Sequence, residues 1–248
     1  MNKLNKLIKL YRGGKKLSCI TAYDASMSKY LDSFGIDIIL VGDSLGQVIQ
    51  GQKTTHNVTT REVIYHASCV KSGNKSATLM VDLPKDSYKS KVQAYNNASY
   101  FISNNLADLV KVETDMENID IVEHLIKKGI PICAHIGLLP QSIKNKSGYR
   151  KYGKTKKEAQ YYYNLAMKLN AINVNIILIE CLDNSLAKSI CKDTNMPVIG
   201  IGSGQGIDGQ VAVIYDLLGI SFNKIDAFST DDRTPLDKQI FKFKKKLK

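Results

Sequence analysis

Five apolar runs in this chain end in an ionisable residue, and this recurrence limits the folds open to it. Four runs end in a carboxylate and one in a histidine, at Asp43, Asp82, Glu113, Glu180 and His135. A carboxylate is costly inside an apolar core, but it is tolerated where a buried strand emerges at the rim of a sheet. In α/β proteins the carboxyl ends of parallel strands share one face, and active sites are built there. The recurrence therefore predicts a metal or acid/base site at that face.

The apolar runs alternate with longer amphipathic stretches along almost the whole chain. Strands are predicted near 17–23, 36–42, 78–82, 109–113, 131–136, 175–180 and 197–202, with a weaker one near 225–228. Helices are predicted near 24–34, 59–71, 89–105, 117–128, 155–170, 183–193, 208–218 and 236–246. The strand runs are continuously apolar rather than alternating, which is typical of parallel strands buried on both faces.

This alternation predicts the α/β class and, within it, a (β/α)8 TIM barrel that residues 1–248 form as a single domain. A doubly wound open sheet is the alternative that strand counts leave open. An N-terminal helix is expected before the barrel, because the apolar residues of that segment share one helical face. These residues are Leu4, Leu7, Ile8 and Tyr11. The long connections 43–58 and 137–154 are expected to cover a substrate.

Composition narrows the classes of protein that this chain can belong to. No apolar run approaches the roughly 20 residues that span a bilayer, and no signal-peptide pattern is present, so a cytoplasmic location without membrane contact is expected. The five cysteines form no CxxC pair, which disfavours structural zinc and disulfides. The formal net charge is +12, but no aromatic residues interleave with arginines as in a nucleic-acid-binding strip. No nucleic-acid partner is therefore expected.

Eight sequence segments together resemble the ketopantoate hydroxymethyltransferase family. They are ITAYD at 20–24, LVGDSLG at 40–46, VTTREVIYH at 58–66, DLP at 82–84, VKVE at 110–113, HIGLLPQS at 135–142, IEC at 179–181 and PVIGIGSG…DGQ at 197–210. Each segment alone is a weak signal. Their shared order and spacing along nearly the whole chain carry the resemblance.

The resemblance implies a reaction and its cofactors. It implies transfer of a hydroxymethyl group from 5,10-methylenetetrahydrofolate to 3-methyl-2-oxobutanoate (2-oxoisovalerate), giving 2-dehydropantoate. This is the first step of the biosynthesis of pantothenate, the precursor of coenzyme A. It also implies one divalent metal ion per subunit, usually Mg²⁺, and a homo-oligomer, often a decamer.

The resemblance also implies roles for individual residues. Asp43, Asp82 and Glu113 match the metal site of the family. Asp43, Ser44, Asp82 and Lys111 match its positions for the 2-oxo acid, and Glu180 matches its catalytic base. His135 is expected in the substrate pocket without a role in proton transfer.

The chemistry explains why these residue types are needed. Hydroxymethylation requires a carbanion at C3, next to the ketone. Carboxylates supply the oxygen ligands that Mg²⁺ prefers, and a 2-oxo acid can chelate the ion, which stabilises the enolate. Glu180 can then remove the C3 proton as a general base. Lys111 lies two residues before Glu113, so both side chains are expected on the same face of their strand.

Each of these residues also has a purely structural explanation. Asp43 and Asp82 could be turn residues, and Lys111 with Glu113 could form a structural ion pair. Glu180 could approach a helix N-terminus. The glycine-rich segment 200–208 resembles a phosphate-binding loop, but close approach of its backbone to a ligand or to a neighbouring loop, with Ser203 near the pocket, is favoured. Because such residues occur at the ends of several predicted strands, a functional role is favoured for the carboxylates.

Several loops depart from the family pattern without touching these positions. The departures are Gln52-Lys53, Lys85-Asp86 and Thr114-Asp115. A basic stretch within 144–157 could attract the polyglutamate tail of a folate, although a solvated loop is the favoured interpretation. Two other functions stay open. One is a lyase of the phosphoenolpyruvate-barrel type, with a catalytic cysteine or further acidic ligands in a loop. The other is a non-catalytic protein, either a degenerate paralogue or a nucleic-acid-binding barrel.

Overall fold

The computed structural model describes residues 2–143 and 149–222, and its centre is a closed barrel of parallel strands. The strands follow one another around the barrel in chain order, and the eighth pairs with the first. They are β1 (Leu17–Thr21), β2 (Ile38–Val41), β3 (Thr78–Asp82), β4 (Leu109–Glu113), β5 (Ile132–Gly137), β6 (Ile176–Glu180), β7 (Val198–Ile201) and β8 (Gly209–Ala212). The predicted (β/α)8 barrel is confirmed, and the open sheet was the wrong alternative.

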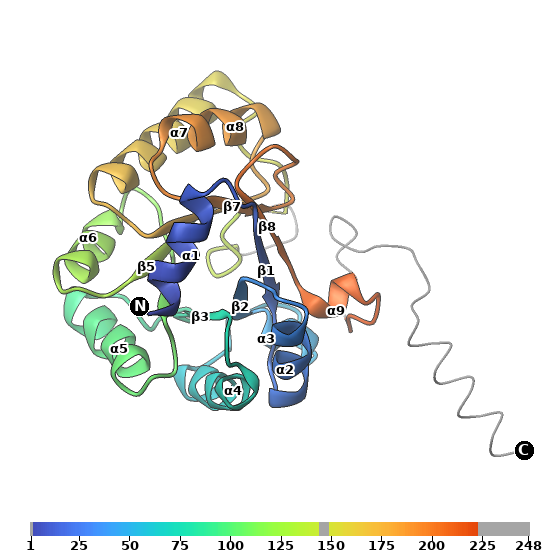
Figure 1. The fold of residues 1–248 in the computed structure, drawn as a ribbon. Helices are drawn as coiled ribbons and strands as arrows, with labels where there is room; N and C mark the ends of the chain where they lie inside the picture. Colours follow the sequence, from blue (N-terminus) through green and yellow to red (C-terminus); the bar gives the residue numbers. More distant parts are fainter. Residues whose placement is uncertain (1, 144–148, 223–248) are drawn as a thin grey trace, which may run out of the picture.

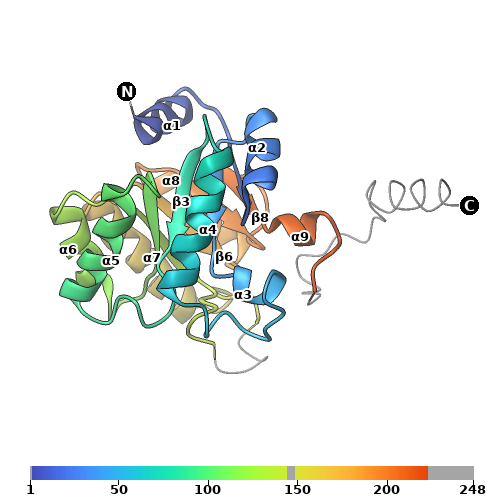
Figure 2. The ribbon, with the colours of Figure 1, turned by 90° about the horizontal axis from the view of Figure 1, so that it is seen from below.

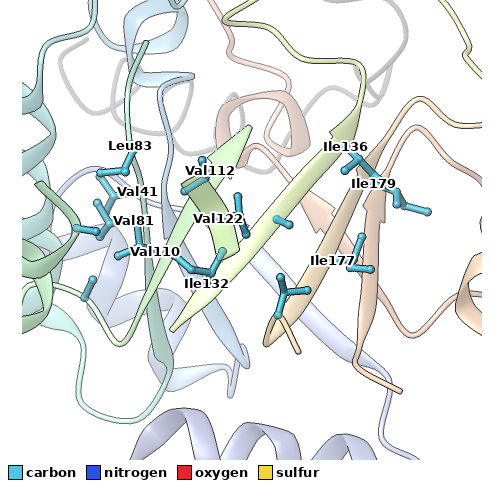
Figure 3. Close-up of a cluster of buried hydrophobic side chains, with 14 of the residues drawn as sticks. Val41, Val81, Leu83, Val110, Val112, Val122, Ile132, Ile136, Ile177 and Ile179 are labelled. Atoms are coloured by element: carbon cyan, nitrogen blue, oxygen red, sulfur yellow. The ribbon is translucent and has the colours of Figure 1, made fainter. Parts of the chain in front are cut away.

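Helices surround the strands and cover their outer faces (Figure 1). They are α2 (Ala25–Ser33), α4 (Thr60–Gly73), α5 (Lys91–Ser103), α6 (Ile119–Lys127), α7 (Lys156–Ala171) and α8 (Asn184–Asp193). Two helices of four residues, α3 (Leu45–Val48) and α9 (Ile214–Leu217), follow β2 and β8. Thr59 and Glu62 form a capping box that ends the long connection after β2 and starts α4. Figure 3 shows one part of the layer between strands and helices, where Val81, Val110 and Ile132 pack with their neighbours.

The N-terminal helix α1 (Lys3–Arg12) closes one end of the barrel. Its residues Leu4 and Leu7 are buried against the apolar side chains inside the barrel, and Ile8 and Tyr11 pack beside them. The predicted apolar face of this helix is therefore confirmed. Figure 2 shows α1 at one end of the barrel and the short helix α3 at the other.

The last strand of the barrel differs from the prediction. The sequence predicts a helix over 208–218, but the chain forms β8 there and then only the short helix α9. Gly209 permits this pairing, because a Cβ atom at that position would lie 2.4 Å from the backbone oxygen of Leu17 in β1. The segment 202–208 joins β7 to β8 without a helix. The predicted strand near 225–228 and helix near 236–246 lie outside the described residues.

Candidate active site

Alternation along the strands directs the predicted site residues into the barrel. In β4, Leu109 belongs to the apolar interior near α1, so Lys111 and Glu113 face the same interior at higher levels. The same spacing of two relates Met80 to Asp82 in β3, Cys133 to His135 in β5 and Leu178 to Glu180 in β6. The carboxyl end of the barrel therefore gathers ionisable groups, and its amino end holds only apolar ones among these strands.

A buried ion pair joins two neighbouring strands. Lys111 Nζ donates to Asp82 Oδ1 at 2.6 Å, and the backbone N–H of Asp43 donates to Asp82 Oδ2 at 3.0 Å. Burial raises the pKa of Asp82 to about 6, with Lys111 opposing that rise and Asp43 adding to it. Burial alone would lower the pKa of Lys111, but Asp82 and Asp43 raise it above its usual value. Above pH 6 the pair is therefore ionised.

Glu113 is held by the loop that follows β5. The backbone N–H of Gln141 donates to Glu113 Oε1 at 3.1 Å. The side chain of Gln141 is itself fixed, because its Nε2 donates to the backbone oxygen of Leu83 at 3.0 Å and its Oε1 accepts from Tyr88 Oη at 2.6 Å. Burial raises the pKa of Glu113 well above its usual value, and the neighbouring Asp43 adds to this.

Ser44 is positioned from β1. Its hydroxyl lies 2.8 Å from the hydroxyl of Tyr23, a buried residue just beyond the end of that strand. The backbone oxygen of Tyr23 lies 2.7 Å from Nδ1 of His66 in α4. His66 is thus a packing residue, and it fixes the backbone that carries Tyr23.

His135 and Glu180 face each other inside the barrel. His135 Nε2 lies 3.2 Å from Glu180 Oε2, and Nδ1 lies 4.0 Å from Glu113 Oε1. These contacts lack hydrogen-bond geometry, and neither ring nitrogen has another partner in the described part of the chain. Burial raises the pKa of Glu180 to about 8, with Lys111 opposing and Asp43 adding to the effect. Burial, aided by Lys111, lowers the pKa of His135 well below its usual value, so the imidazole is neutral.

A glycine brings Glu180 close to the neighbouring strand. Gly137 has φ 101°, and a Cβ atom there would lie 2.2 Å from the backbone oxygen of Glu180. That oxygen instead accepts from the backbone N–H of Leu138 at 2.8 Å. Any residue larger than glycine would separate β5 from β6 at the level of the His135–Glu180 contact.

These side chains line a single cavity at the carboxyl end of the barrel, with about 760 Å³ of empty space that opens to solvent. Its lining includes Asp43, Ser44, Asp82, Lys111, His135 and Glu180, together with Thr21, Leu40, Gly42, Gln47, Val48, Thr55, Pro140, Tyr149, Leu178, Ile201, Val211, Val213 and Asp216. The structure thus brings together every predicted residue except Glu113, which contacts His135 and Gln141 and is absent from the lining.

Sequence reasoning missed several residues of this cavity. Thr55, Tyr149 and Asp216 lie in loops or in a four-residue helix, where no periodic pattern marks them. Gln141 was visible only as part of the HIGLLPQS segment. The connection after β2 does reach the cavity through Thr55, as expected for a covering loop. Residues 144–148 of the other long connection lie outside the described residues, together with Lys144 and Lys146 of the basic stretch.

The carboxylates fit a divalent cation in their chemistry. Asp43 Oδ2 and Glu113 Oε2 are buried without a hydrogen-bond partner among the described residues. Unpartnered buried oxygens of this kind are costly unless a ligand satisfies them, and hard oxygen donors suit Mg²⁺. Within residues 2–143 and 149–222, however, no group of three His, Cys, Asp or Glu side chains already converges on one point.

The glycine-rich segment 200–208 contacts a neighbouring helix rather than forming an anion site. Ser203 Oγ accepts from the backbone N–H of Leu182 at 3.1 Å and lies 3.2 Å from the backbone oxygen of Ile179, to which it donates. Asn184 at the start of α8 donates to the backbone oxygens of Ser203 and Gln205. Close approach to a neighbouring element is confirmed, but Ser203 does not line the cavity.

Comparison with known proteins agrees with the sequence segments described above. The family model described as ketopantoate hydroxymethyltransferase matches residues 2–235. A 3-methyl-2-oxobutanoate hydroxymethyltransferase from Nitrosococcus oceani is 42% identical over 226 residues, which cover 91% of this chain and 86% of that protein. The protein of the same name from Idiomarina loihiensis is 40% identical over 225 residues, covering 91% and 84%.

Solved structures share the fold at low sequence identity. Phosphonopyruvate hydrolase in complex with oxalate and Mg²⁺ aligns with a TM-score of 0.66 at 11% identity, covering 100% of this chain and 98% of that one. Oxaloacetate acetylhydrolase in complex with the product oxalate aligns with a TM-score of 0.64 at 10% identity, covering 86% and 80%. Within the described ranges, each helix is too short or too polar to cross a bilayer. On the family model and the close relatives, this chain belongs to the ketopantoate hydroxymethyltransferase family.

Proposed function

We propose that this protein transfers a hydroxymethyl group from 5,10-methylenetetrahydrofolate to 3-methyl-2-oxobutanoate, giving 2-dehydropantoate. The observation that carries the proposal is the single cavity in which Glu180, His135, Lys111 and the carboxylates of Asp43 and Asp82 meet. A site for enolising a 2-oxo acid needs a base, a cation for the substrate oxygens and oxygen ligands for a metal. All three occur on strands of one barrel or just beyond the end of a strand.

Asp43, Asp82 and Glu113 are the residues that would hold Mg²⁺. The ion would supply Lewis-acid stabilisation for the negative charge that develops on the keto oxygen. Lys111 places a second positive charge at the same level of the barrel, where it pairs with the oxygens of the 2-oxo acid. Ser44, fixed by Tyr23 at 2.8 Å, donates or accepts a hydrogen bond at the edge of this pocket.

Glu180 is the general base in this proposal. In its ionised form it takes the C3 proton, and the electron pair of the broken C–H bond forms the enolate. Water adds to the methylene carbon of the donor as its two C–N bonds break, which releases tetrahydrofolate and leaves the carbon as formaldehyde. The enolate then attacks this carbon, and its oxygen, protonated by Glu180, becomes the new hydroxyl group. The pKa of Glu180, raised to about 8 by burial, makes the carboxylate a stronger base than an exposed glutamate. His135 stays neutral beside it, with Nε2 at 3.2 Å from Oε2, and does not carry the proton.

A lyase with a catalytic cysteine is the alternative from the same fold. No cysteine is found among the described residues that line the cavity. Burial also raises the pKa of Cys133 and of Cys181 to about 12, which keeps these thiols protonated at neutral pH. The transferase is therefore favoured.

The decisive experiment follows the C3 proton of 2-oxoisovalerate by NMR in D₂O without folate, with and without Mg²⁺. Metal-dependent exchange is expected, and Glu180→Gln should reduce it by about 10²–10⁴-fold. Glu117→Gln removes an exposed carboxylate and should exchange like the unaltered protein. If no exchange occurs, and no product forms after 5,10-methylenetetrahydrofolate is added, the proposed function is wrong.

Three further expectations accompany this proposal. They are a single domain over residues 1–248, a cytoplasmic location and a homo-oligomeric assembly. Attraction of a folate polyglutamate tail by the basic residues of 144–157 also stays a prediction.

A further inference from the structure

The cavity has two chemically different sides. The ionisable groups of the proposed reaction lie on β3 to β6 and at the end of β2. On the side of β8 the lining is mostly apolar, with Val211 and Val213 at and after that strand. The cavity is open to solvent, so a ligand longer than a small 2-oxo acid can extend out of it.

One carboxylate stands on this apolar side. Asp216 in α9 is only 5% exposed and lines the cavity. Its carboxylate accepts a hydrogen bond from Ser221 Oγ, and no cation pairs with it among the described residues. Burial raises its pKa above the usual value. An ionised carboxylate in such a place is costly unless a ligand donates to it.

The surroundings of Asp216 are fixed to the rest of the site. The backbone N–H of Ile214 donates to Oγ1 of Thr21 at 3.0 Å, which ties the start of α9 to β1. Unlike Asp216, a polar group in the connection after β2 has no hydrogen-bond partner among the described residues. The hydroxyl of Thr55 lines the same cavity, is buried in a residue 2% exposed, and has no hydrogen bond among the described residues.

A folate carries its one-carbon unit at the edge of a flat amino-pyrimidinone ring system, so that end must enter the cavity while the acidic tail stays near solvent. The ring presents two neighbouring N–H donors, at N3 and at the 2-amino group, which match the two oxygens of a carboxylate. Its faces suit apolar walls. We propose that Asp216 anchors the amino-pyrimidinone end of the folate donor by accepting these two hydrogen bonds, an inference that rests on the proposed function.

The test compares tetrahydrofolate with its 2-desamino analogue, each titrated into the full-length protein by calorimetry. The unaltered protein should prefer tetrahydrofolate by about tenfold or more, as expected for hydrogen bonds to a charged group. Asp216→Asn keeps the size of the side chain and should lose most of that preference. Ser221→Ala removes the hydrogen bond inside the turn but keeps the carboxylate, and should retain the preference.

Two results would overturn the inference. One is an unaltered protein without preference for tetrahydrofolate, which needs no variant to be informative. The other is an Asp216→Asn variant that weakens both ligands equally, because that is the signature of a structural role. Deuterium exchange by the unaltered protein reports on the proposed function separately. Deuterium exchange without a preference for tetrahydrofolate would contradict only the role of Asp216. A preference for tetrahydrofolate without deuterium exchange would contradict only the proposed reaction.

Discussion

Strand β4 presents Leu109 toward one end of the barrel interior and Glu113 toward the other, with Lys111 between them. Around Leu109 the interior is apolar, and Leu4 and Leu7 of α1 close it. Around Glu113 the interior holds charged groups, and Oε2 of that residue has no partner in the described structure. The same strand therefore supports an apolar end, which stabilises the fold, and a charged end, whose buried groups cost stability. This is expected where a functional site departs from the rules of core packing.

The pH dependence of stability sharpens this comparison most. The pKa of Glu180 is raised from an ordinary 4.5 to about 8, so this group favours the folded state below pH 4.5, and that contribution is lost as pH rises through 8. A shift of this size corresponds to up to about 5 kcal/mol. Urea unfolding with EDTA gives the difference in the free energy of unfolding between Glu180→Gln and the unaltered protein. This difference should favour the variant more at pH 9 than at pH 5. A difference that does not change with pH would contradict the buried ionisation of Glu180.

The Asp82–Lys111 pair provides the second test. Asp82→Ala leaves Lys111 buried without its partner at 2.6 Å and should cost about 3–5 kcal/mol of the free energy of unfolding. The double variant Asp82→Leu/Lys111→Met removes both charges and should recover most of that loss of stability. Deuterium exchange of the 2-oxo acid should be abolished in both variants. If the double variant is as unstable as the single one, the loss comes from packing rather than from an unpaired charge.

A substitution at the apolar end, near α1, should lower stability without affecting substrate binding. Leu109→Ala removes a fully buried side chain from the apolar interior and should cost about 3 kcal/mol of the free energy of unfolding. Because Leu109 lies outside the cavity lining, the KM for the 2-oxo acid should stay within about twofold of the unaltered value. A large rise in KM would show that the two ends are mechanically coupled.

The sequence predicted the residues at the charged end of the barrel better than it predicted the last part of the barrel. Residues such as Lys111 and Glu180 were accessible because the alternation of a strand fixes where they point. Strand β8 was missed because its four residues, starting with Gly209, carry no β-type pattern, and its pairing depends on close approach to Leu17. Asp216 was missed for the same reason, since a short helix after an unrecognised strand has no predictable direction.

The support of Glu113 could not be read from the sequence either, because it depends on contacts between loops far apart in the chain. Gln141 reaches Glu113 with its backbone, while its side chain binds Leu83 and Tyr88. The sequence segment around Gln141 was visible as a family pattern, but its partners were not. These hydrogen bonds depend on how the loops that carry Leu83, Tyr88 and Gln141 lie relative to one another in space.

Tyr88→Phe tests this support and should have the smallest effect. Loss of the hydroxyl that donates to Gln141 at 2.6 Å should cost about 1 kcal/mol of the free energy of unfolding. Because Gln141 then holds Glu113 less firmly, the Mg²⁺ concentration for half-maximal deuterium exchange should rise severalfold. Tyr100→Phe, at a tyrosine that is 46% exposed, should change neither quantity. A loss of stability without a change in Mg²⁺ dependence would make Gln141 a loop anchor that has no bearing on the metal site.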